Sequence, residues 1–282
     1  MAVILDGKKI AGEIRQEIKK ETEKIFAERQ IKPGLAVIIV GDDPASAIYV
    51  RNKEKAAQEV GFNSVVKRYP ANTSQEDLLA AVDEINNDKS IHGMIVQLPL
   101  PKHLNEKEVI KRIDPKKDVD GLHPLSIGAL TIGDKGLVSC TPKGCIHLIK
   151  ETGIEISGKK AVVVGRSNMV GKPVALLLLQ ENATVTICHS RTKDLKAELQ
   201  DADIIVAAVG IANLIKGDMV KKGAVVIDVG INRSEDGKLC GDVDFAAASE
   251  NAGFITPVPG GVGPMTIAML LSNTLEAFYN GI

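Results

Sequence analysis

At residues 161–173 the chain reads AVVVGRSNMVGKP. Its first four residues are apolar and mostly β-branched, which is typical of a strand buried on both faces. Gly165 and Gly171 follow, and residues 174–180 continue with a helix-forming pattern. A glycine turn between a strand and a helix lets backbone N–H groups approach a phosphate, which the helix N-terminus also attracts. The stretch therefore predicts a strand–turn–helix unit of an α/β fold.

The same alternation of short apolar runs and helical segments recurs along the chain. Further buried strands are predicted at residues 35–40, 93–96, 184–187, 204–206 and 225–227. The segments between them, and those at both ends, carry apolar residues at helical spacing. This order predicts an α/β protein with parallel sheets and right-handed crossovers.

A length of 282 residues corresponds to about two domains. We expect a helix start with Thr141 as N-cap and Pro142 as the first helical residue, and we place the domain boundary there. The first domain then covers residues 1–140 and the second covers residues 141–264. The last helix, over residues 265–282, follows a break rich in glycine and proline.

Composition excludes several classes of function. The 35 Lys and Arg residues balance 36 Asp and Glu residues, aromatic residues make up 3%, and Trp is absent. A nucleic-acid partner is therefore not expected. The longest apolar stretch, at residues 204–214, is shorter than the ~20 residues that span a bilayer. Four scattered cysteines and no signal-peptide pattern predict a soluble cytoplasmic protein that has no membrane partner.

The residues after the predicted strand at 184–187 bear on the cofactor. An NAD site usually has an acidic residue here, which binds the ribose 2′-hydroxyl. This chain instead has Ser190 and Arg191, and Arg166 lies in the glycine turn. Hydroxyl and guanidinium groups suit a 2′-phosphate, so the pattern favours NADP. The alternatives are a polar loop and, because the glycine spacing is GxxxxxG and not GxGxxG, a turn that binds nothing.

In the first domain, Asp43 is expected to cap a helix on which Ser46, Tyr49 and Lys53 share one stripe. Lys55 points nearly the opposite way. A Tyr face beside a Lys amine can bind a flat heterocycle, and the Lys can act as an acid or base if partial burial lowers its pKa. The alternative is a solvated surface pair.

Two loops follow apparent strands, where ligands of open α/β sheets bind. Gln97 lies in the first loop and can hydrogen-bond a Lys, whereas Asp120 lies in the second and can accept from ring or amino N–H groups. Asp118, Asp120 and His123 also form a possible metal cluster. A turn containing Asp and Gly explains this cluster more simply, so no metal is predicted.

Taken together, these segments resemble the bifunctional 5,10-methylenetetrahydrofolate dehydrogenase/methenyltetrahydrofolate cyclohydrolase family. The matching segments are residues 49–53, 93–100, 117–121, 140–144, 165–171, 228–232 and 256–266. They occur in the family's order and span almost the whole chain. The last segment, TPVPGGVGPMT, is highly specific, and a simple Gly/Pro linker would not account for the other six.

The resemblance implies roles for individual residues. Lys53 is the general acid/base of the cyclohydrolase step, Gln97 tunes it, and Asp120 holds the pterin-like end of the folate. The other implied folate contacts are Tyr49, which stacks on the ring system, and Val96, Leu98, Pro259, Gly260, Gly261, Val262 and Gly263. The implied NADP contacts are Gly165, Arg166, Ser167, Ser190 and Ile231.

The resemblance also implies the reaction. The enzyme oxidises 5,10-methylenetetrahydrofolate with NADP and hydrolyses the 5,10-methenyl product to 10-formyltetrahydrofolate, in one-carbon metabolism that serves purine, histidine and methionine biosynthesis. The second domain is then Rossmann-like, the last helix returns to the first domain, and the chain forms a homodimer. A dehydrogenase-only member would lack an effective Lys53–Gln97 pair. A non-catalytic dinucleotide sensor would leave Tyr49, Lys53, Gln97 and Asp120 incidental.

Overall fold

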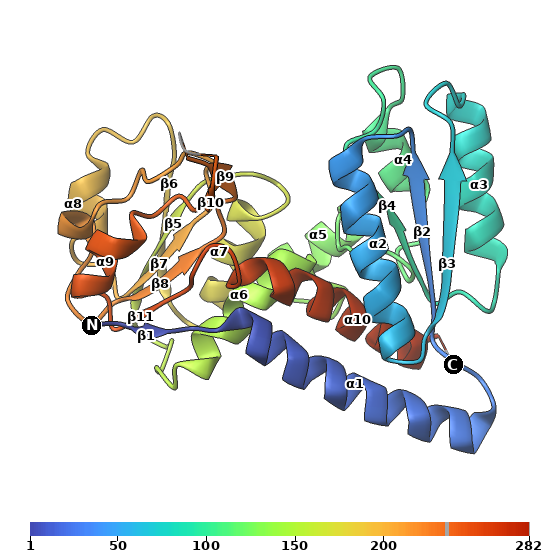
Figure 1. Ribbon diagram of the computed structural model, residues 1–282, viewed down its shortest axis with the longest axis horizontal. Coiled ribbons are helices and arrows are strands. Elements are labelled where there is room, and N and C mark those ends of the chain that lie inside the picture. Colours follow the sequence, from blue (N-terminus) through green and yellow to red (C-terminus); the bar gives the residue numbers. More distant parts are fainter. Residues whose placement is uncertain (235–236, 282) are drawn as a thin grey trace. The chain divides into compact units, whose positions relative to one another are not determined.

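The structure is a computed structural model that describes residues 1–234 and 237–281 (Figure 1). The chain forms two compact units. The three-stranded unit consists of Gly12–Cys140 and of the chain from Ile267 onward, and the six-stranded unit consists of Met1–Ala11 and Thr141–Thr266. From Ile267 the last helix, α10 (Val262–Asn280), belongs to the three-stranded unit, as predicted for the closing helix.

The six-stranded unit has a parallel sheet in the order β1-β11-β8-β7-β5-β6. Its strands are β1 (Val3–Ile4), β5 (Lys160–Val164), β6 (Thr184–Cys188), β7 (Ile204–Ala207), β8 (Val225–Asp228) and β11 (Phe254–Ile255). β6 lies on one side of β5 and β7 lies on the other, so the winding of the sheet reverses at β5. The arrangement confirms the predicted α/β fold with parallel sheets.

The connections of this unit are helical. They are α6 (Cys140–Glu151), α7 (Gly171–Gln180), α8 (Leu195–Leu199), the 3₁₀ helix η1 (Gly217–Met219) and α9 (Phe245–Asn251). A short antiparallel ladder joins β9 (Asn232–Arg233) and β10 (Leu239–Cys240). The expectation of a cap at Thr141 was wrong. α6 begins at Cys140, two residues before the predicted first helical residue, and the Thr141 hydroxyl pairs with the Thr266 hydroxyl at 2.9 Å.

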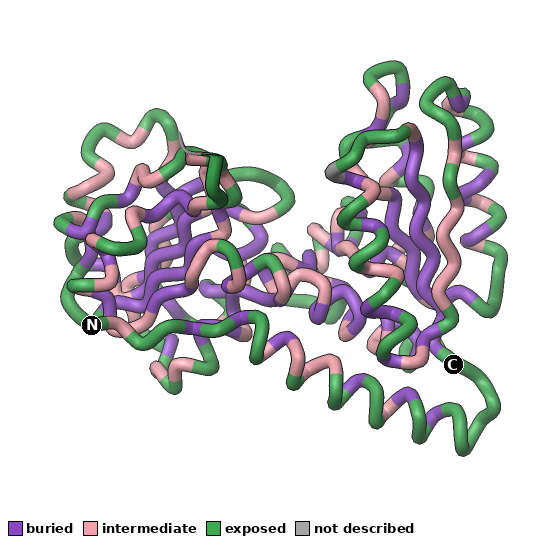
Figure 2. Tube along the Cα trace, viewed as in Figure 1, coloured by how far each residue is buried: buried purple, intermediate pink, exposed green. Residues whose placement is uncertain are grey.

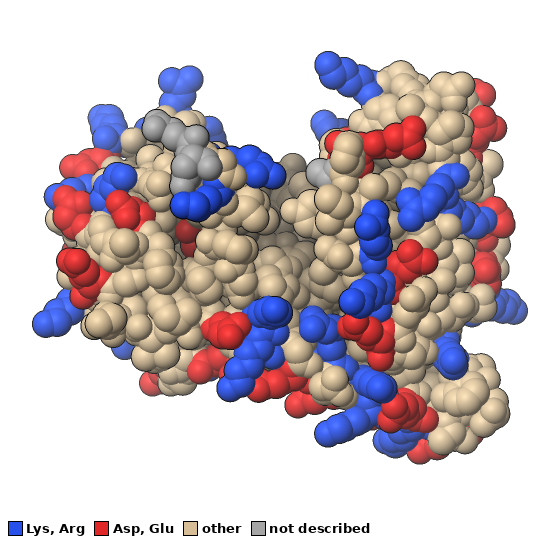
Figure 3. Space-filling view, in the orientation of Figure 1, with Lys and Arg blue, Asp and Glu red and all other residues tan. Residues whose placement is uncertain are grey.

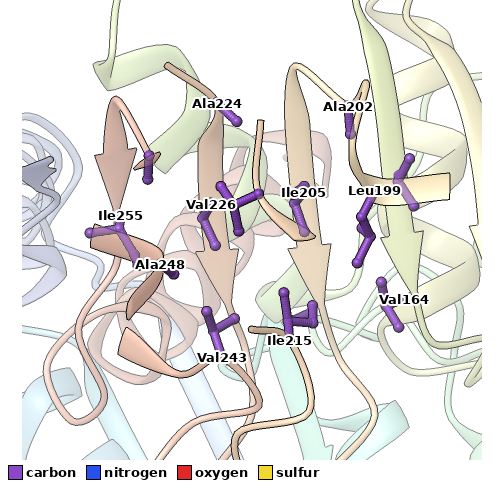
Figure 4. Close-up of a cluster of buried hydrophobic side chains, with 14 of the residues drawn as sticks. Val164, Leu199, Ala202, Ile205, Ile215, Ala224, Val226, Val243, Ala248 and Ile255 are labelled. Carbon is purple, nitrogen blue, oxygen red and sulfur yellow. The ribbon is translucent and has the colours of Figure 1, made fainter. Parts of the chain in front are cut away.

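One face of this sheet packs against α8 and α9. Alternate strand residues point to the same face, so Ile205 and Val226 share it, and Leu199 and Ala248 from the two helices cover them (Figure 4). All four side chains are fully buried. The continuous apolar runs of β7 and β8 follow from this burial on both faces.

The three-stranded unit has a parallel sheet in the order β3-β2-β4. Its strands are β2 (Gly34–Val40), β3 (Asn63–Tyr69) and β4 (Gly93–Val96). Its helices besides α10 are α1 (Gly7–Arg29), from Gly12 onward, and α2 (Pro44–Glu59), α3 (Gln75–Asn87), α4 (Glu106–Arg112) and α5 (Pro124–Ile132). β2 and β4 are buried along their whole length, whereas the edge strand β3 is largely half-exposed (Figure 2).

The surface carries both signs of charge. On the face shown in Figure 3, Lys and Arg side chains are interspersed with Asp and Glu side chains on each unit, in keeping with the formal net charge of −1. Among the described residues, no helix has both the length and the apolar character needed to cross a membrane.

Candidate active site

Lys53 and Gln97 are in direct contact in the three-stranded unit. The Lys53 ammonium donates a hydrogen bond to Gln97 Oε1, with 3.0 Å between Nζ and Oε1. The Gln97 N–H donates to the Ile38 carbonyl of β2 at 2.8 Å, and its Nε2 donates to the Leu98 carbonyl at 2.6 Å. Because the amide NH₂ group is already engaged, the amide oxygen is the atom left to face Lys53.

α2 presents Lys53 from a well-defined helix start. Pro44 is the first helical residue, and the Asp43 carboxylate accepts from the Ser46 N–H at 2.7 Å. Hydrogen bonds from the backbone and from the side chain of Ser46 lower the pKa of Asp43. Tyr49, one turn before Lys53, is 47% exposed and is available to a planar ligand. Lys55 lies elsewhere on the helix, in a 3.9 Å ion pair with Glu59.

Asp120 follows a segment that lies beside β4. Met94 of β4 and Asp118 form a parallel bridge, and the Met94 N–H donates to the Lys117 carbonyl at 2.7 Å. Asp120 is half-buried and comes two residues after this bridge. The structure therefore brings the predicted Asp120 loop alongside β4, the strand that directly precedes Gln97.

The Asp118 side chain fixes the conformation of the Asp120 loop by hydrogen bonds to the residues that follow it. Its carboxylate is buried and accepts from the N–H groups of Leu122 (3.2 Å) and His123 (2.7 Å) and from the Ser126 hydroxyl (2.8 Å). Burial raises the pKa of Asp118 in spite of these hydrogen bonds. The His123 ring accepts from the Leu125 N–H and so caps α5. The Asp118 carboxylate and the His123 ring are thus hydrogen-bonded to other groups of the protein. The described residues contain no cluster of three metal-ligating side chains.

Asn273 of α10 supports the same loop. Its fully buried side chain donates to the carbonyls of Val119 at 2.9 Å and Val138 at 2.7 Å. No pattern in the sequence indicated Asn273, because an Asn on an otherwise apolar helix face gives no sign of a partner some 150 residues away.

In the six-stranded unit, the predicted glycine turn lies between β5 and α7. Gly165 has a φ of +129°, and a Cβ there would lie 2.2 Å from the Ala208 carbonyl oxygen, so only glycine fits. The Ser167 hydroxyl accepts from the N–H groups of Val170 (3.1 Å) and Gly171 (3.3 Å). Ser167 thus satisfies two N–H groups at the start of α7.

This turn is adjacent to the end of β6, since the Gly165 N–H donates to the Cys188 carbonyl at 2.9 Å. Arg166, Ser190 and Arg191 are all exposed. They supply two guanidinium groups and a hydroxyl, and residues 188–192 include no carboxylate. This donor set fits the 2′-phosphate of NADP.

The remaining predicted residues differ in exposure. Ile231, after β8, is 56% exposed, whereas Val96 and Val262 are buried. Leu98 is half-buried. The predicted residues at 259–263 belong to the six-stranded unit, where Gly260 has a φ of +105°.

Comparison with known proteins identifies the family. The profile of the tetrahydrofolate dehydrogenase/cyclohydrolase catalytic domain matches residues 5–120, and that of the NAD(P)-binding domain matches residues 139–281. The chain belongs to the tetrahydrofolate dehydrogenase/cyclohydrolase family.

Relatives of the chain match it over nearly its full length. The bifunctional protein FolD of Moorella thermoacetica is 62% identical over 276 residues, which is 98% of both chains. The crystal structure of the bifunctional FolD of Campylobacter jejuni is 47% identical and covers 100% of both chains, with a TM-score of 0.97. The Trypanosoma brucei dehydrogenase-cyclohydrolase, solved with NADP cofactor and an inhibitor, is 41% identical over 99% of this chain and 98% of its own, with a TM-score of 0.94.

Membership of the tetrahydrofolate dehydrogenase/cyclohydrolase family confirms several predictions. The chain is a bifunctional enzyme of one-carbon folate metabolism, with an oxidoreductase and a hydrolase activity, and it has an NAD(P)-binding domain. Its six-stranded unit is the Rossmann-like one.

This family member also holds a buried carboxylate, Asp228, at the end of β8. The Asp228 carboxylate accepts from the N–H groups of Gly230, Asp242 and Val243, each at 2.9 Å. Burial raises the pKa of Asp228 to about 6, although these three hydrogen bonds act in the opposite direction.

The raised pKa of Asp228 predicts a pH-dependent stability. Between the unfolded-state pKa of 3.8 and the folded-state pKa of about 6, the folded enzyme binds more protons, so the free energy of unfolding falls as the pH rises. The expected contribution is at most about 1.4 kcal/mol per pH unit. Urea unfolding between about pH 4 and pH 7 should show a slope that is more negative in the wild type than in Asp228→Asn, because carboxylates with a lowered pKa, such as Asp203, add the opposite slope to both proteins. Exposed Asp201→Asn should keep the wild-type slope. Parallel curves for wild type and Asp228→Asn would contradict the assignment.

Proposed function

We propose that Lys53 and Gln97 carry out proton transfer in the cyclohydrolase step, the hydrolysis of 5,10-methenyltetrahydrofolate to 10-formyltetrahydrofolate. The observation that carries this proposal is the 3.0 Å hydrogen bond from Lys53 Nζ to Gln97 Oε1. It fixes the position of the amine beside an exposed Tyr49 ring on the same face of α2. The exposed Lys55 has no comparable placement.

The chemistry needs one group that both accepts and donates a proton. The methenyl carbon is electrophilic enough for water to add to it. The Lys53 amine, in its neutral form, accepts the proton of the attacking water and then donates it to the ring nitrogen as the carbon–nitrogen bond breaks. The hydroxyl of the adduct loses its proton to solvent, and the formyl group results. Gln97 orients the amine through its fixed amide oxygen.

Asp120 and Tyr49 hold the folate in this proposal. The Asp120 carboxylate accepts hydrogen bonds from the amino and ring N–H groups of the pterin-like end, and Tyr49 stacks on the ring system. The other proposed folate contacts are Val96, Leu98, Pro259, Gly260, Gly261, Val262 and Gly263.

The proposed NADP contacts are Gly165, Arg166, Ser167, Ser190 and Ile231. When bound, NADP accepts a hydride from the methylene carbon of the folate. The protein's task in this step is placement, since the reaction needs proximity more than acid or base help. The side chains of Arg166 and Ser190 hold the 2′-phosphate, with Arg191 as a further candidate.

We also propose a domain organisation, an oligomeric state and a cellular location for the enzyme. Residues 1–140 with the closing helix 265–282 are assigned to the folate-binding catalytic domain and residues 141–264 to the NADP-binding domain, except that Met1–Ala11, with β1, belongs to the six-stranded unit. The enzyme is a cytoplasmic homodimer that takes the small-molecule folate as its partner, not a nucleic acid or a membrane, and its products serve purine, histidine and methionine biosynthesis. The four cysteines are free, which is consistent with the cytoplasmic setting. Ile187 is exposed on the edge strand β6, which is consistent with a homodimer.

Replacement of Lys53 tests the cyclohydrolase assignment. Lys53→Met should lower methenyl hydrolysis by about 10²–10⁴-fold, because the proton-transferring amine is removed, while NADP and folate still bind. The assay follows methenyltetrahydrofolate at a pH where its spontaneous hydrolysis is slow. Lys55→Met, the same change two residues away, should leave turnover unchanged. Near wild-type hydrolysis by Lys53→Met would refute the role of Lys53.

Replacement of Asp120 tests the folate contact. Asp120→Ala should weaken folate binding by about 1.5–3 kcal/mol, or roughly tenfold to a hundredfold, because a charged acceptor of ring N–H groups is lost. Affinity for NADP should change little. Calorimetric titration of each ligand separates the two effects. Equal losses for both ligands, or no loss for folate, would place Asp120 outside the pocket.

Replacement of Arg166 tests the source of cofactor preference. The wild type should prefer NADP to NAD, and Arg166→Ala should raise the KM for NADP about tenfold, because a charge-assisted hydrogen bond to the 2′-phosphate is lost. The KM for NAD should stay nearly constant. Steady-state kinetics with both cofactors measure this difference. A wild type that uses both cofactors equally well, or a variant impaired equally with both, would contradict the prediction.

A further inference from the structure

We infer that Asp242 is a positioning residue for the nicotinamide half of NADP, and that it acts by fixing the backbone of the loops that follow β7 and β8. The inference rests on the proposed placement of NADP along the carboxyl edge of the six-stranded sheet. Asp242 itself is fully buried, so it acts through the loops and not by touching the cofactor.

The Asp242 carboxylate accepts four hydrogen bonds from two loops. Its Oδ2 accepts from the N–H groups of Val209 at 2.7 Å and Gly210 at 3.1 Å. Its Oδ1 accepts from the Ile211 N–H and from Asn232 Nδ2, each at 2.9 Å. Three consecutive N–H groups after β7 and one side chain after β8 thus converge on a single carboxylate.

A second buried carboxylate holds Asp242 in place. The Asp242 N–H donates to Asp228 Oδ1 at 2.9 Å, and the Gly230 N–H donates to the same oxygen. The Asp228 N–H in turn donates to the Thr256 hydroxyl at 2.8 Å. All donors to the two carboxylates in these contacts are neutral amide groups. In these contacts Asp228 and Asp242 therefore fix the positions of backbone N–H groups and of one side-chain amide, and neither carboxylate is paired with a cationic side chain.

The packing around the pair leaves no space for adjustment. A Cβ at Gly230 would lie 2.3 Å from Asp242 Oδ1, and one at Gly241 would lie 1.9 Å from Asp228 Oδ2. The loop backbones are thus pressed directly onto the carboxylates. A change in the geometry of either carboxylate must shift the loops.

The pair lies at the carboxyl edge of the sheet. Figure 4 shows Val243, the residue after Asp242, near the arrowhead of the strand that carries Val226. Ile215, which bridges to Val243, lies near the arrowhead of the strand that carries Ile205. Ligands of open parallel sheets bind outside this edge.

The sheet order assigns this region to one half of the dinucleotide. The glycine turn after β5 is the pyrophosphate site, and Ser190 after β6 is on the 2′-phosphate side. β7 and β8 lie on the opposite side of β5, so the nicotinamide half lies over their loops. Each loop presents an exposed apolar side chain there, Ile211 at 54% and Ile231 at 56%. Ile211 is bound to Asp242 by its own N–H, and Ile231 directly precedes Asn232.

Asp242→Asn tests the inference with little change in size. Its amide keeps one acceptor oxygen, but its NH₂ group meets N–H donors in place of the second oxygen. We expect the dehydrogenase KM for NADP to rise about tenfold and kcat to fall. Inhibition by adenosine 2′,5′-bisphosphate, which carries only the adenosine half, should stay within twofold of wild type. Methenyl hydrolysis should also stay within twofold, since Lys53 and Gln97 belong to the other unit.

The matched control is Asp244→Asn, which makes the same chemical change two residues away. Asp244 caps α9, and Asn serves equally well as a cap, so all three readouts should match wild type. If Asp242→Asn does not fold, Asn232→Ala decides by the same comparison. That variant removes one of the four donors and should raise the KM for NADP about threefold with unchanged bisphosphate inhibition.

Two results would overturn the inference. One is an Asp242→Asn enzyme with wild-type KM and kcat for NADP. The other is an equal weakening of NADP and of adenosine 2′,5′-bisphosphate, which would indicate general damage to the domain. Failure of the bisphosphate to compete with NADP in the wild type would instead refute the proposed placement of the cofactor, and the inference with it.

Discussion

Parallel pairing of the strands is the constraint on which the rest of this structure depends. In the six-stranded and the three-stranded sheet every strand runs the same way, so every carboxyl end lies at one edge of its own sheet. Gln97 follows β4, the glycine turn follows β5, and Ser190 follows β6. The polar groups of the candidate sites are thus gathered by strand direction, although they lie far apart in the sequence. The buried strands need only be apolar, and the loops beyond them carry the chemistry.

The carboxyl edge also creates a difficulty, because backbone N–H groups beyond the last ladder hydrogen bond lose their partners. Buried aspartates resolve it in both units. In the three-stranded unit, Asp118 accepts from two backbone N–H groups in the loop that follows the segment beside β4. In the six-stranded unit, Asp228 accepts from three backbone N–H groups, one after β8 and two at residues 242 and 243. Asp242 accepts from three more after β7. Burial of these carboxylates is unfavourable, but the N–H groups offset it. The result is loops with defined conformations where a ligand must be placed.

The sequence predicts those features that are local. Fully buried strands such as β2, β4 and β7 were predicted to within one residue, since burial on both faces demands an unbroken apolar run. Strand β3 was missed because it is an edge strand that carries Lys67 and Arg68. The two-residue strands β1 and β11 were missed because their pairing, Val3 with Phe254, is set by the fold and not by either segment. Helical spacing predicted that Ser46, Tyr49 and Lys53 share one face of α2. The hydrogen bond from Lys53 to Gln97 could not be predicted in this way, because Gln97 is brought to α2 by the sheet.

The glycine turn shows how the same physics yields an unusual spacing. In GxGxxG turns the first glycine makes the tight turn, the second admits the pyrophosphate, and the last allows close packing of helix and strand. Here Gly165 takes the first role, against the Ala208 carbonyl, and a Cβ at Gly171 would lie 2.3 Å from the Gly165 carbonyl oxygen, which is the last role. No glycine occupies the middle, where Arg166 and Ser167 stand. The middle of the turn therefore offers a guanidinium and a hydroxyl where the common fingerprint offers bare backbone. The presence of Arg166 and Ser167 in place of a middle glycine explains why the sequence does not match the GxGxxG fingerprint. It also gives the turn a basic character that suits an extra phosphate.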